Sequence, residues 1–136
     1  MMISTKGRYA LRVMLDLAEH QNDGYIPLAE IAARQNISEK YLESILSVLS
    51  KAGLLDALRG KGGGYRLAKD PADYSVYDIL CLTEGTLAPV TCLEDGRSCE
   101  NASSCRTFPL WQGLDDTVRK YLSGFTLTNV LRMRKN

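Results

Sequence analysis

Hydrophobic residues in the first half of the chain recur every three or four positions in three separate segments, which predicts three helices. The first helix is expected over 5–19, and a shorter second helix over 28–34. The third is expected over 39–52, because Ser38 can cap its start and Gly53 can end it. This third helix is strongly two-faced. Its apolar face consists of Leu42, Ile45, Leu46 and Leu49.

The hydrophobic period changes after the third helix. Two short strands are expected over 54–59 and 65–68, joined by a glycine-rich turn at 61–64. A helix, a short helix, a tight connection, a helix and a β-hairpin follow one another in a winged helix-turn-helix. The pattern therefore predicts a mainly α-helical fold with one small β-hairpin.

The second half of the chain predicts two further helices separated by a loop. Ser75 can cap a helix that runs to about residue 84, and Thr107 can cap a long helix that runs to about residue 122. The intervening segment is rich in polar and small residues, which favours a loop. A short tail over 126–134 has room for one or two more helical turns.

The last long helix carries an apolar stripe that the winged domain is not expected to need. The winged fold should be complete by about residue 84, so we divide the chain into a DNA-binding domain (1–84), a cysteine-containing loop (85–106) and a helix with a tail (107–136). An unused amphipathic helix favours a symmetric homodimer built on this helix. The residues expected at the dimer interface are Leu110, Trp111, Leu114, Val118 and Leu122.

Composition narrows the class of protein. The chain has 136 residues, 45% of them hydrophobic and 24% charged, which is typical of one globular domain. No apolar run is long enough to span a bilayer, and the start lacks a signal peptide's apolar core, so we expect a cytoplasmic protein. In the first predicted helix, the charged residues Arg8, Arg12 and Asp16 fall outside the apolar face.

Charge gives only a local indication of a nucleic-acid partner. The net charge is +1, but the stretch 59–69 carries four basic residues and no acid. Such a run is either a DNA-binding surface or an ordinary solvated face. The glycines at 62–64 have no P-loop lysine and no following helix, so we expect no nucleotide site there. The chain also lacks a catalytic His/Asp/Ser constellation and is not expected to be an enzyme.

Three of the four cysteines lie in the loop, at Cys92, Cys99 and Cys105, with the spacing C-x6-C-x5-C. In a reducing compartment, clustered cysteines more often bind metal or react with oxidants than form structural disulfides. Three thiolates can converge on a soft metal centre. Zinc sites usually contain closely spaced C-x2-4-C pairs, which this loop lacks. The residues alone leave an iron–sulfur cluster, a zinc site and a thiol sensor open.

Four stretches of the chain together resemble a known bacterial family. These are 3–18, 37–55, the wing 59–68 and the TEG sequence at 83–85. They resemble the family of regulators that includes IscR, NsrR and CymR, and the resemblance covers nearly the whole chain. It implies a homodimeric winged-helix transcription factor that binds double-stranded operator DNA. Many members hold an iron–sulfur cluster in a three-cysteine loop at this place.

The resemblance therefore implies an iron–sulfur cluster on Cys92, Cys99 and Cys105, with [2Fe–2S] favoured over [4Fe–4S]. The alternative is a cluster-free repressor similar to CymR, which a partner protein or thiol oxidation would control. The fourth ligand does not carry over. The histidine of IscR-like members is replaced by Phe108, and the partner acid of NsrR-like members by Arg8. The remaining candidates are water, a small thiol, Cys81, Glu94, Asp95 and Glu100.

The polar face of the third helix supplies candidate DNA contacts. Ser38 and Lys40 suit phosphates, because a capped helix start and a positive charge both attract anions. Tyr41 suits either a phosphate or packing. Glu43 can accept a hydrogen bond from a cytosine amino group, or it is an ordinary solvated glutamate. Ser44 can contact bases or phosphates.

The wing supplies the second set of candidate contacts. Arg59 and Lys61 provide charge beside glycines that allow close approach to a groove. Insertion of the arginine into the minor groove is consistent with this composition.

Overall fold

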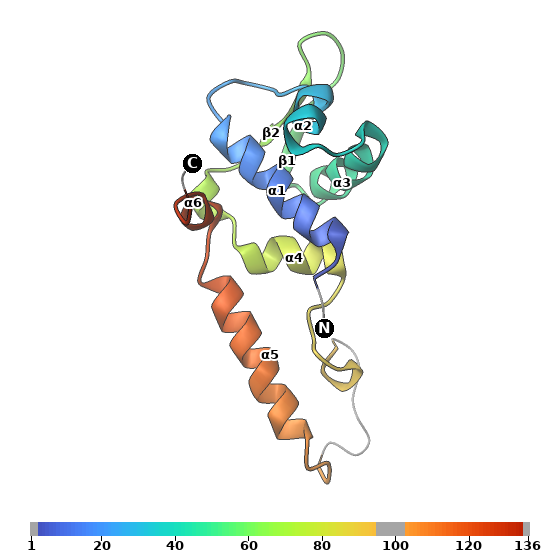
Figure 1. The fold of residues 1–136 in the computed structure, drawn as a ribbon, viewed down its shortest axis with the longest axis vertical. Coiled ribbons are helices and arrows are strands. Elements are labelled where there is room, and N and C mark those ends of the chain that lie inside the picture. The colour runs from blue at the N-terminus through green and yellow to red at the C-terminus, as the bar shows by residue number, and fades with distance from the viewer. Residues whose placement is uncertain (1–2, 95–102, 135–136) are drawn as a thin grey trace.

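A computed structural model describes residues 3–94 and 103–134 of the chain. It confirms a mainly α-helical fold with one two-stranded antiparallel hairpin (Figure 1). In chain order the elements are α1 (Thr5–Glu19), α2 (Leu28–Gln35), α3 (Glu39–Lys51), β1 (Leu55–Leu58), β2 (Gly64–Leu67), the 3₁₀ turn η1 (Pro71–Asp73), α4 (Val76–Glu84), the 3₁₀ turn η2 (Thr91–Leu93), α5 (Phe108–Ser123) and α6 (Leu127–Leu131).

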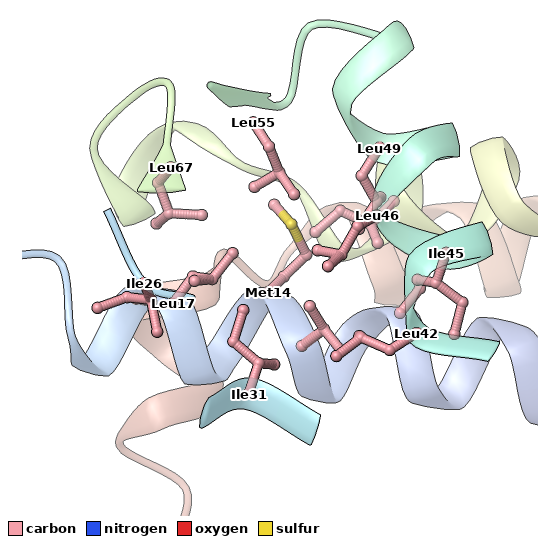
Figure 2. Packing of buried hydrophobic residues seen from close by; sticks show 14 of the residues in the cluster. Met14, Leu17, Ile26, Ile31, Leu42, Ile45, Leu46, Leu49, Leu55 and Leu67 are labelled. Carbon is pink, nitrogen blue, oxygen red and sulfur yellow. The ribbon is translucent and has the colours of Figure 1, made fainter. Parts of the chain in front are cut away.

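The core of the winged part is built on α1, which lies between the helix-turn-helix and α4 (Figure 1). Met14 lies at the centre of this core, and Leu17 lies one turn further along the same helix (Figure 2). All four residues of the apolar face predicted for α3 are buried, because this face packs onto α1 and α2. The two strands close the core from the other side through Leu55 and Leu67.

Side-chain caps explain where three of the helices begin. Ser4, Ser38 and Ser75 each accept a hydrogen bond from a backbone N–H of the first turn of α1, α3 and α4. The cap predicted at Thr107 is wrong. Thr107 has helical backbone angles, and its side chain accepts no bond from the first turn of α5. Its hydroxyl lies instead 3.3 Å from the sulfur of Cys105.

The expectation that the winged core is complete by residue 84 is also wrong. Leu127 of α6 is fully buried in the same cluster as Met14. The backbone N–H of Leu127 donates to the carbonyl of Tyr74 at 3.2 Å, and that of Val76 donates to the carbonyl of Phe125 at 2.9 Å. The chain therefore leaves the winged part after α4 and returns to it along α5 and α6 (Figure 1).

Helix α5 projects from the rest of the molecule, and none of its residues is buried in the single chain (Figure 1). Leu110 is 63% exposed, and Leu114 and Tyr121 are exposed on the same side. The helix contacts the rest of the chain along one side: Leu122 packs with Val76 and Leu80 of α4, and Arg119 lies over the ring of Tyr77. None of the helices formed by residues 3–94 and 103–134 is long and apolar enough to cross a bilayer.

Candidate nucleic-acid interface and cysteine loop

The first two turns of α3 place the predicted contact residues on one exposed surface. Ser38 accepts a hydrogen bond from the N–H of Tyr41 at 3.2 Å, and Ser44 donates to the carbonyl of Tyr41 at 2.7 Å. The ring of Tyr41 packs edge-on against Tyr9 of α1, with 5.8 Å between ring centres. The ring of Tyr41 therefore packs within the protein, whereas a contact of its hydroxyl with a phosphate stays a prediction. The exposed residues on these turns are Ser38, Glu39, Lys40, Glu43 and Ser44.

The turn between α2 and α3 is fixed by a buried carboxylate that the sequence placed outside the apolar face. Asp16 is only 3% exposed. Arg34 donates to both of its oxygens, at 2.8 and 3.0 Å, and Gln35 donates to one at 2.8 Å. Arg12 in turn donates to the side chain of Gln35 at 3.2 Å. Since Gln35 ends α2, this network holds the segment that leads into α3.

The environment of Asp16 favours its charged form. Burial by itself would raise the pKa of Asp16, but hydrogen bonds from Arg34 and Gln35, together with the charge of Arg34, hold it below its ordinary value. The same contact raises the pKa of Arg34. His20, the only histidine of the chain, lies at the end of α1 with Nδ1 2.8 Å from the carbonyl of Asp16. It therefore belongs to this network.

The wing is a short hairpin whose tip is exposed. Leu58 pairs with Gly64 at the end of the ladder, and Arg59 and Lys61 follow in the exposed turn. Gly64 has φ +147°, and a Cβ at this position would lie 2.2 Å from the carbonyl oxygen of Ile26. A glycine is needed there because the hairpin also pairs with Ile26, through bonds of 2.8 and 2.9 Å to Tyr65.

A groove of about 500 Å³ separates α3 from the wing. The sequence did not predict it, since it arises only when the two elements are placed side by side. From α3 it is lined by residues at successive helical turns, and from the wing by both strands and the start of the turn. The lining residues of α3 are Glu43, Ser47, Ser50 and Lys51. Those of the wing include Leu58, Arg59, Gly60 and Tyr65.

The structure describes both ends of the cysteine loop. Cys92 lies in η2, Cys105 lies just before α5, and both are half-buried. The hydroxyl of Thr107 and the backbone N–H groups of Thr107 and Phe108 lower the pKa of Cys105, because they stabilise its thiolate. Cys99 lies outside the described residues. None of the three described cysteines is in a disulfide.

The described residues do not supply an obvious fourth ligand. Phe108 and Arg8 offer no ligand atom of the familiar kinds, and the guanidinium of Arg8 donates to Thr5 at 3.1 Å. Cys81 lines a cavity of about 90 Å³ together with Leu93, the residue that follows Cys92 in the sequence. Its hydrogen bond with Tyr77, together with burial, raises the pKa of that tyrosine to about 12.

The geometry of the remaining candidates is only partly described. Glu94 is half-buried beside η2. Asp95 and Glu100 lie outside the described residues. Within residues 3–94 and 103–134, no three His, Cys, Asp or Glu side chains gather closely enough to hold a metal ion. A three-thiol centre therefore depends on Cys99.

Comparisons with known proteins support a fold shared with transcriptional regulators. Residues 3–133 match the family model Rrf2, described as an iron-dependent transcriptional regulator. The HTH-type transcriptional regulator IscR of Photobacterium profundum is 39% identical over 132 residues, which cover 97% of this chain and 76% of that protein.

Two solved structures are similar over almost their whole length. CymR, the global cysteine regulator of B. subtilis, matches with a TM-score of 0.81 and 38% identity, covering 99% of each chain. IscR of T. potens matches with a TM-score of 0.76 and 34% identity, covering 100% of this chain and 94% of that one. Both kinds of regulator are thus similar to this chain to about the same degree.

Proposed function

Because the chain belongs to the Rrf2 family of transcriptional regulators, we propose that it is a homodimeric DNA-binding regulator that senses iron–sulfur status, redox state or nitric oxide. The sensor is an iron–sulfur cluster, [2Fe–2S] in preference to [4Fe–4S], held by Cys92, Cys99 and Cys105. The relatives named above are transcriptional regulators and not enzymes.

The observation that carries the cluster proposal is the surroundings of Cys105, whose sulfur lies 3.3 Å from the hydroxyl of Thr107. A metal ligand must be a thiolate, and the donors around Cys105 lower its pKa in a half-exposed position where a cluster can be assembled. Sulfur donors suit iron–sulfur centres and other soft metals. The donor set therefore fits a cluster, and the lack of a fourth cysteine in the loop suits one that responds readily to its surroundings.

The proposed mechanism is a shift between two arrangements of the dimer. When bound, the cluster supplies redox and ligand-exchange chemistry at the loop. The loop begins directly after Glu84, whose carboxylate accepts hydrogen bonds from the N–H of Ser4 at 3.0 Å and from its hydroxyl at 2.6 Å. Ser4 caps α1, and Tyr9 of α1 packs on Tyr41 of the recognition helix. Ordering of the loop can therefore reach the DNA-binding surface through α1.

A second candidate is a cluster-free repressor of cysteine or sulfur metabolism, controlled by a partner protein or by thiol oxidation. It is favoured by Phe108 and Arg8, which stand where the familiar fourth ligands would be, and by the similarity to CymR. The deciding measurement is the visible spectrum, with the iron and sulfide content, of protein purified without oxygen. Coloured protein with equal iron and sulfide supports the sensor, and colourless iron-free protein after reconstitution supports the repressor.

A dimer is expected to form through the exposed stripe of α5. Leu114→Glu should convert it to a monomer, because a charge would face the apolar surface of the partner helix. The dimer would present two recognition helices to half-sites about 34–36 Å apart. Light scattering at micromolar concentration measures the mass. The proposed interface consists of Leu110, Trp111, Leu114, Val118 and Leu122, which are all exposed or half-buried.

The matched control for the dimer is Lys120→Glu, which adds negative charge on the opposite side of α5. It should leave the mass of the dimer unchanged. A wild-type protein that is monomeric with and without its cluster contradicts the proposed interface.

The proposed DNA contacts divide into phosphate contacts and one base contact. Replacing Glu43 by alanine is expected to remove discrimination of about 1–3 kcal/mol at one base pair, since a carboxylate can accept from a cytosine amino group. Non-specific binding should not weaken, because the carboxylate repels phosphates. The phosphate or groove contacts are expected from Ser38, Lys40, Tyr41, Ser44, Arg59 and Lys61.

The Glu43 prediction is measured with a series of operators that differ at single base pairs, at one salt concentration. Glu39→Ala is the matched control, because it removes another exposed carboxylate from the first turn of the same helix. Equal losses of affinity for every operator would mean that Glu43 supports the helix without contributing to sequence recognition.

A further inference from the structure

A small polar cavity lies where α4, η2 and α5 meet, away from the DNA-binding surface. Its volume is about 90 Å³. It is lined by Tyr77, Cys81, Leu93, Asp115, Arg119 and the linker residues 85–88. Two helices that are far apart in the sequence therefore bring a thiol, a phenol, a carboxylate and a guanidinium to one cavity.

The nucleophile of this cavity is the thiol of Cys81. Cys81 is half-buried and is not in a disulfide, so small molecules can reach its sulfur. Its sulfur forms a hydrogen bond with the hydroxyl of Tyr77, which lies one turn earlier on α4. A phenolic O–H can donate to a thiolate sulfur, so Tyr77 both orients the sulfur and supplies a donor to it.

The cation of the cavity is held in place by two contacts. The guanidinium of Arg119 lies 5.3 Å from the centre of the Tyr77 ring, and Asp115 lies 3.6 Å from the guanidinium. Reactive cysteines are typically found near a cation, which stabilises negative charge on sulfur. A positioned cation also stabilises the charge that develops on a departing oxygen. The cavity therefore combines a nucleophile with a hydrogen-bond donor and a fixed positive charge.

The size of the cavity limits the molecules that can react there. One water occupies about 30 Å³ in the liquid, so the cavity has room for the equivalent of about three waters. Hydrogen peroxide has only two oxygen atoms and fits this space. A tripeptide thiol such as glutathione, or an aromatic hydroperoxide such as cumene hydroperoxide, is too large for it.

We propose that Cys81 is a modification site, at which hydrogen peroxide oxidises the thiol to a sulfenic acid. The sulfur forms a bond to one peroxide oxygen while the O–O bond breaks. The other oxygen leaves as hydroxide, takes up the proton that the thiol has lost and becomes water. Sulfur is oxidised by two electrons, and the peroxide is reduced by two. This inference does not depend on the cluster or on DNA binding, because Cys81 lies outside the proposed ligands and DNA contacts.

The cavity also determines what happens to the product. A sulfenic acid usually condenses with a second thiol to give a disulfide. A cavity of this size leaves no room for a second thiol compound beside the oxidised sulfur. The sulfenic acid of Cys81 should therefore persist until the protein unfolds or a small reductant reaches it.

The test treats the full chain with peroxide after a chelator has removed any bound iron, because iron would itself react with peroxide. Dimedone, which traps sulfenic acids, is then added in urea so that it reaches a sulfur inside the cavity. Peptide mass spectrometry measures the adduct at Cys81 and, as an internal reference outside the cavity, at Cys105. The ratio of the Cys81 adduct to the Cys105 adduct is expected to be about tenfold higher with hydrogen peroxide than with cumene hydroperoxide.

Two variants test the groups that line the cavity. Tyr77→Phe keeps the ring beside Arg119 but removes the hydroxyl, and it should slow the oxidation of Cys81 about threefold. Arg119→Gln removes the cation and should slow it about three- to tenfold. Lys120→Gln is the matched control, because it removes a charge from the next position of α5, which does not line the cavity. It should leave the rate at Cys81 unchanged.

Four results would overturn the proposal. The first is a Cys81 that stays a free thiol while Cys105 is oxidised. The second is an equal adduct ratio with both peroxides, since Cys81 would then react as an open surface thiol. The third is a disulfide between Cys81 and Cys92 in place of the dimedone adduct. The fourth is an unchanged rate in both Tyr77→Phe and Arg119→Gln, because the cavity would then contribute nothing to the reaction.

Discussion

Replacing Asp16 by alanine is expected to lower the free energy of unfolding by about 3 kcal/mol. Breaking a buried ion pair usually costs about 3–5 kcal/mol, because the remaining charge is left without a partner. The lower end applies here, since the side chain of Arg34 is 34% exposed and water can hydrate it after the carboxylate is removed. Urea unfolding at neutral pH measures the difference.

A matched control comes from the second acid that pairs with Arg34. Glu30 lies 3.7 Å from the guanidinium and is 58% exposed. Exposed pairs of this kind contribute about 0–1 kcal/mol, so Glu30→Ala should have little effect. If both variants unfold at the same urea concentration as wild type, the buried network does not stabilise the fold.

The contribution of Asp16 should also depend on pH in one direction. Its pKa is lower in the folded protein than in the unfolded chain, so the unfolded chain binds a proton first as the pH falls. The stabilisation is therefore fully present above the ordinary carboxyl pKa of about 4, and it is lost as the pH falls through the lower folded value. The difference in stability between wild type and Asp16→Asn should shrink in that acidic range.

The winged part was predictable because its helices and hairpin follow local rules. The two-faced pattern of α3, its serine cap and the glycine turn of the wing each determine local structure, and the structure confirms all three. Asp16 was not predictable in the same way. Along α1 it occupies a polar position like any surface residue, and its burial depends on Arg34 and Gln35, which lie 18 and 19 residues away.

The same limit applies to the two features that join distant parts of the chain. Leu127 belongs to a helix of five residues, too short for a periodic signal, and its burial follows from the return of the chain to Tyr74. The groove beside Ser50 exists only because the wing folds back next to α3. Polar residues on the open face of α3 gave some indication of a contact surface, but no local pattern could show that the wing lies beside it.

The cysteine loop shows how far spacing alone determines a site. The spacing indicated three thiols, and the structure adds that the hydroxyl of Thr107 and two backbone N–H groups lower the pKa of Cys105 at the start of α5. Residues 3–94 and 103–134 do not identify the fourth ligand, because a ligand atom can come from any residue that the fold or a partner brings near. The three cysteines therefore make a stronger prediction than any statement about the complete ligand set.

The replacement of Cys92, Cys99 or Cys105 by serine is expected to abolish the cluster in each case. A serine hydroxyl is a hard ligand that stays protonated near neutral pH, so it replaces a thiolate poorly at a soft metal centre. Each variant should be colourless and free of iron and sulfide after anaerobic reconstitution, whereas wild type should hold about two irons per chain, as a [2Fe–2S] centre requires. Visible absorption with iron and sulfide analysis measures this.

The fourth cysteine provides the internal control, since Cys81→Ser also removes one thiol. This variant is expected to keep the cluster, because the Cys81 thiol already bonds with Tyr77 in the cavity between α4 and α5. Loss of iron in Cys81→Ser, with the fold intact by circular dichroism, would make Cys81 the fourth ligand. Full iron content in any one of the three loop variants would remove that cysteine from the ligand set, because a residue that binds iron cannot be dispensable for it.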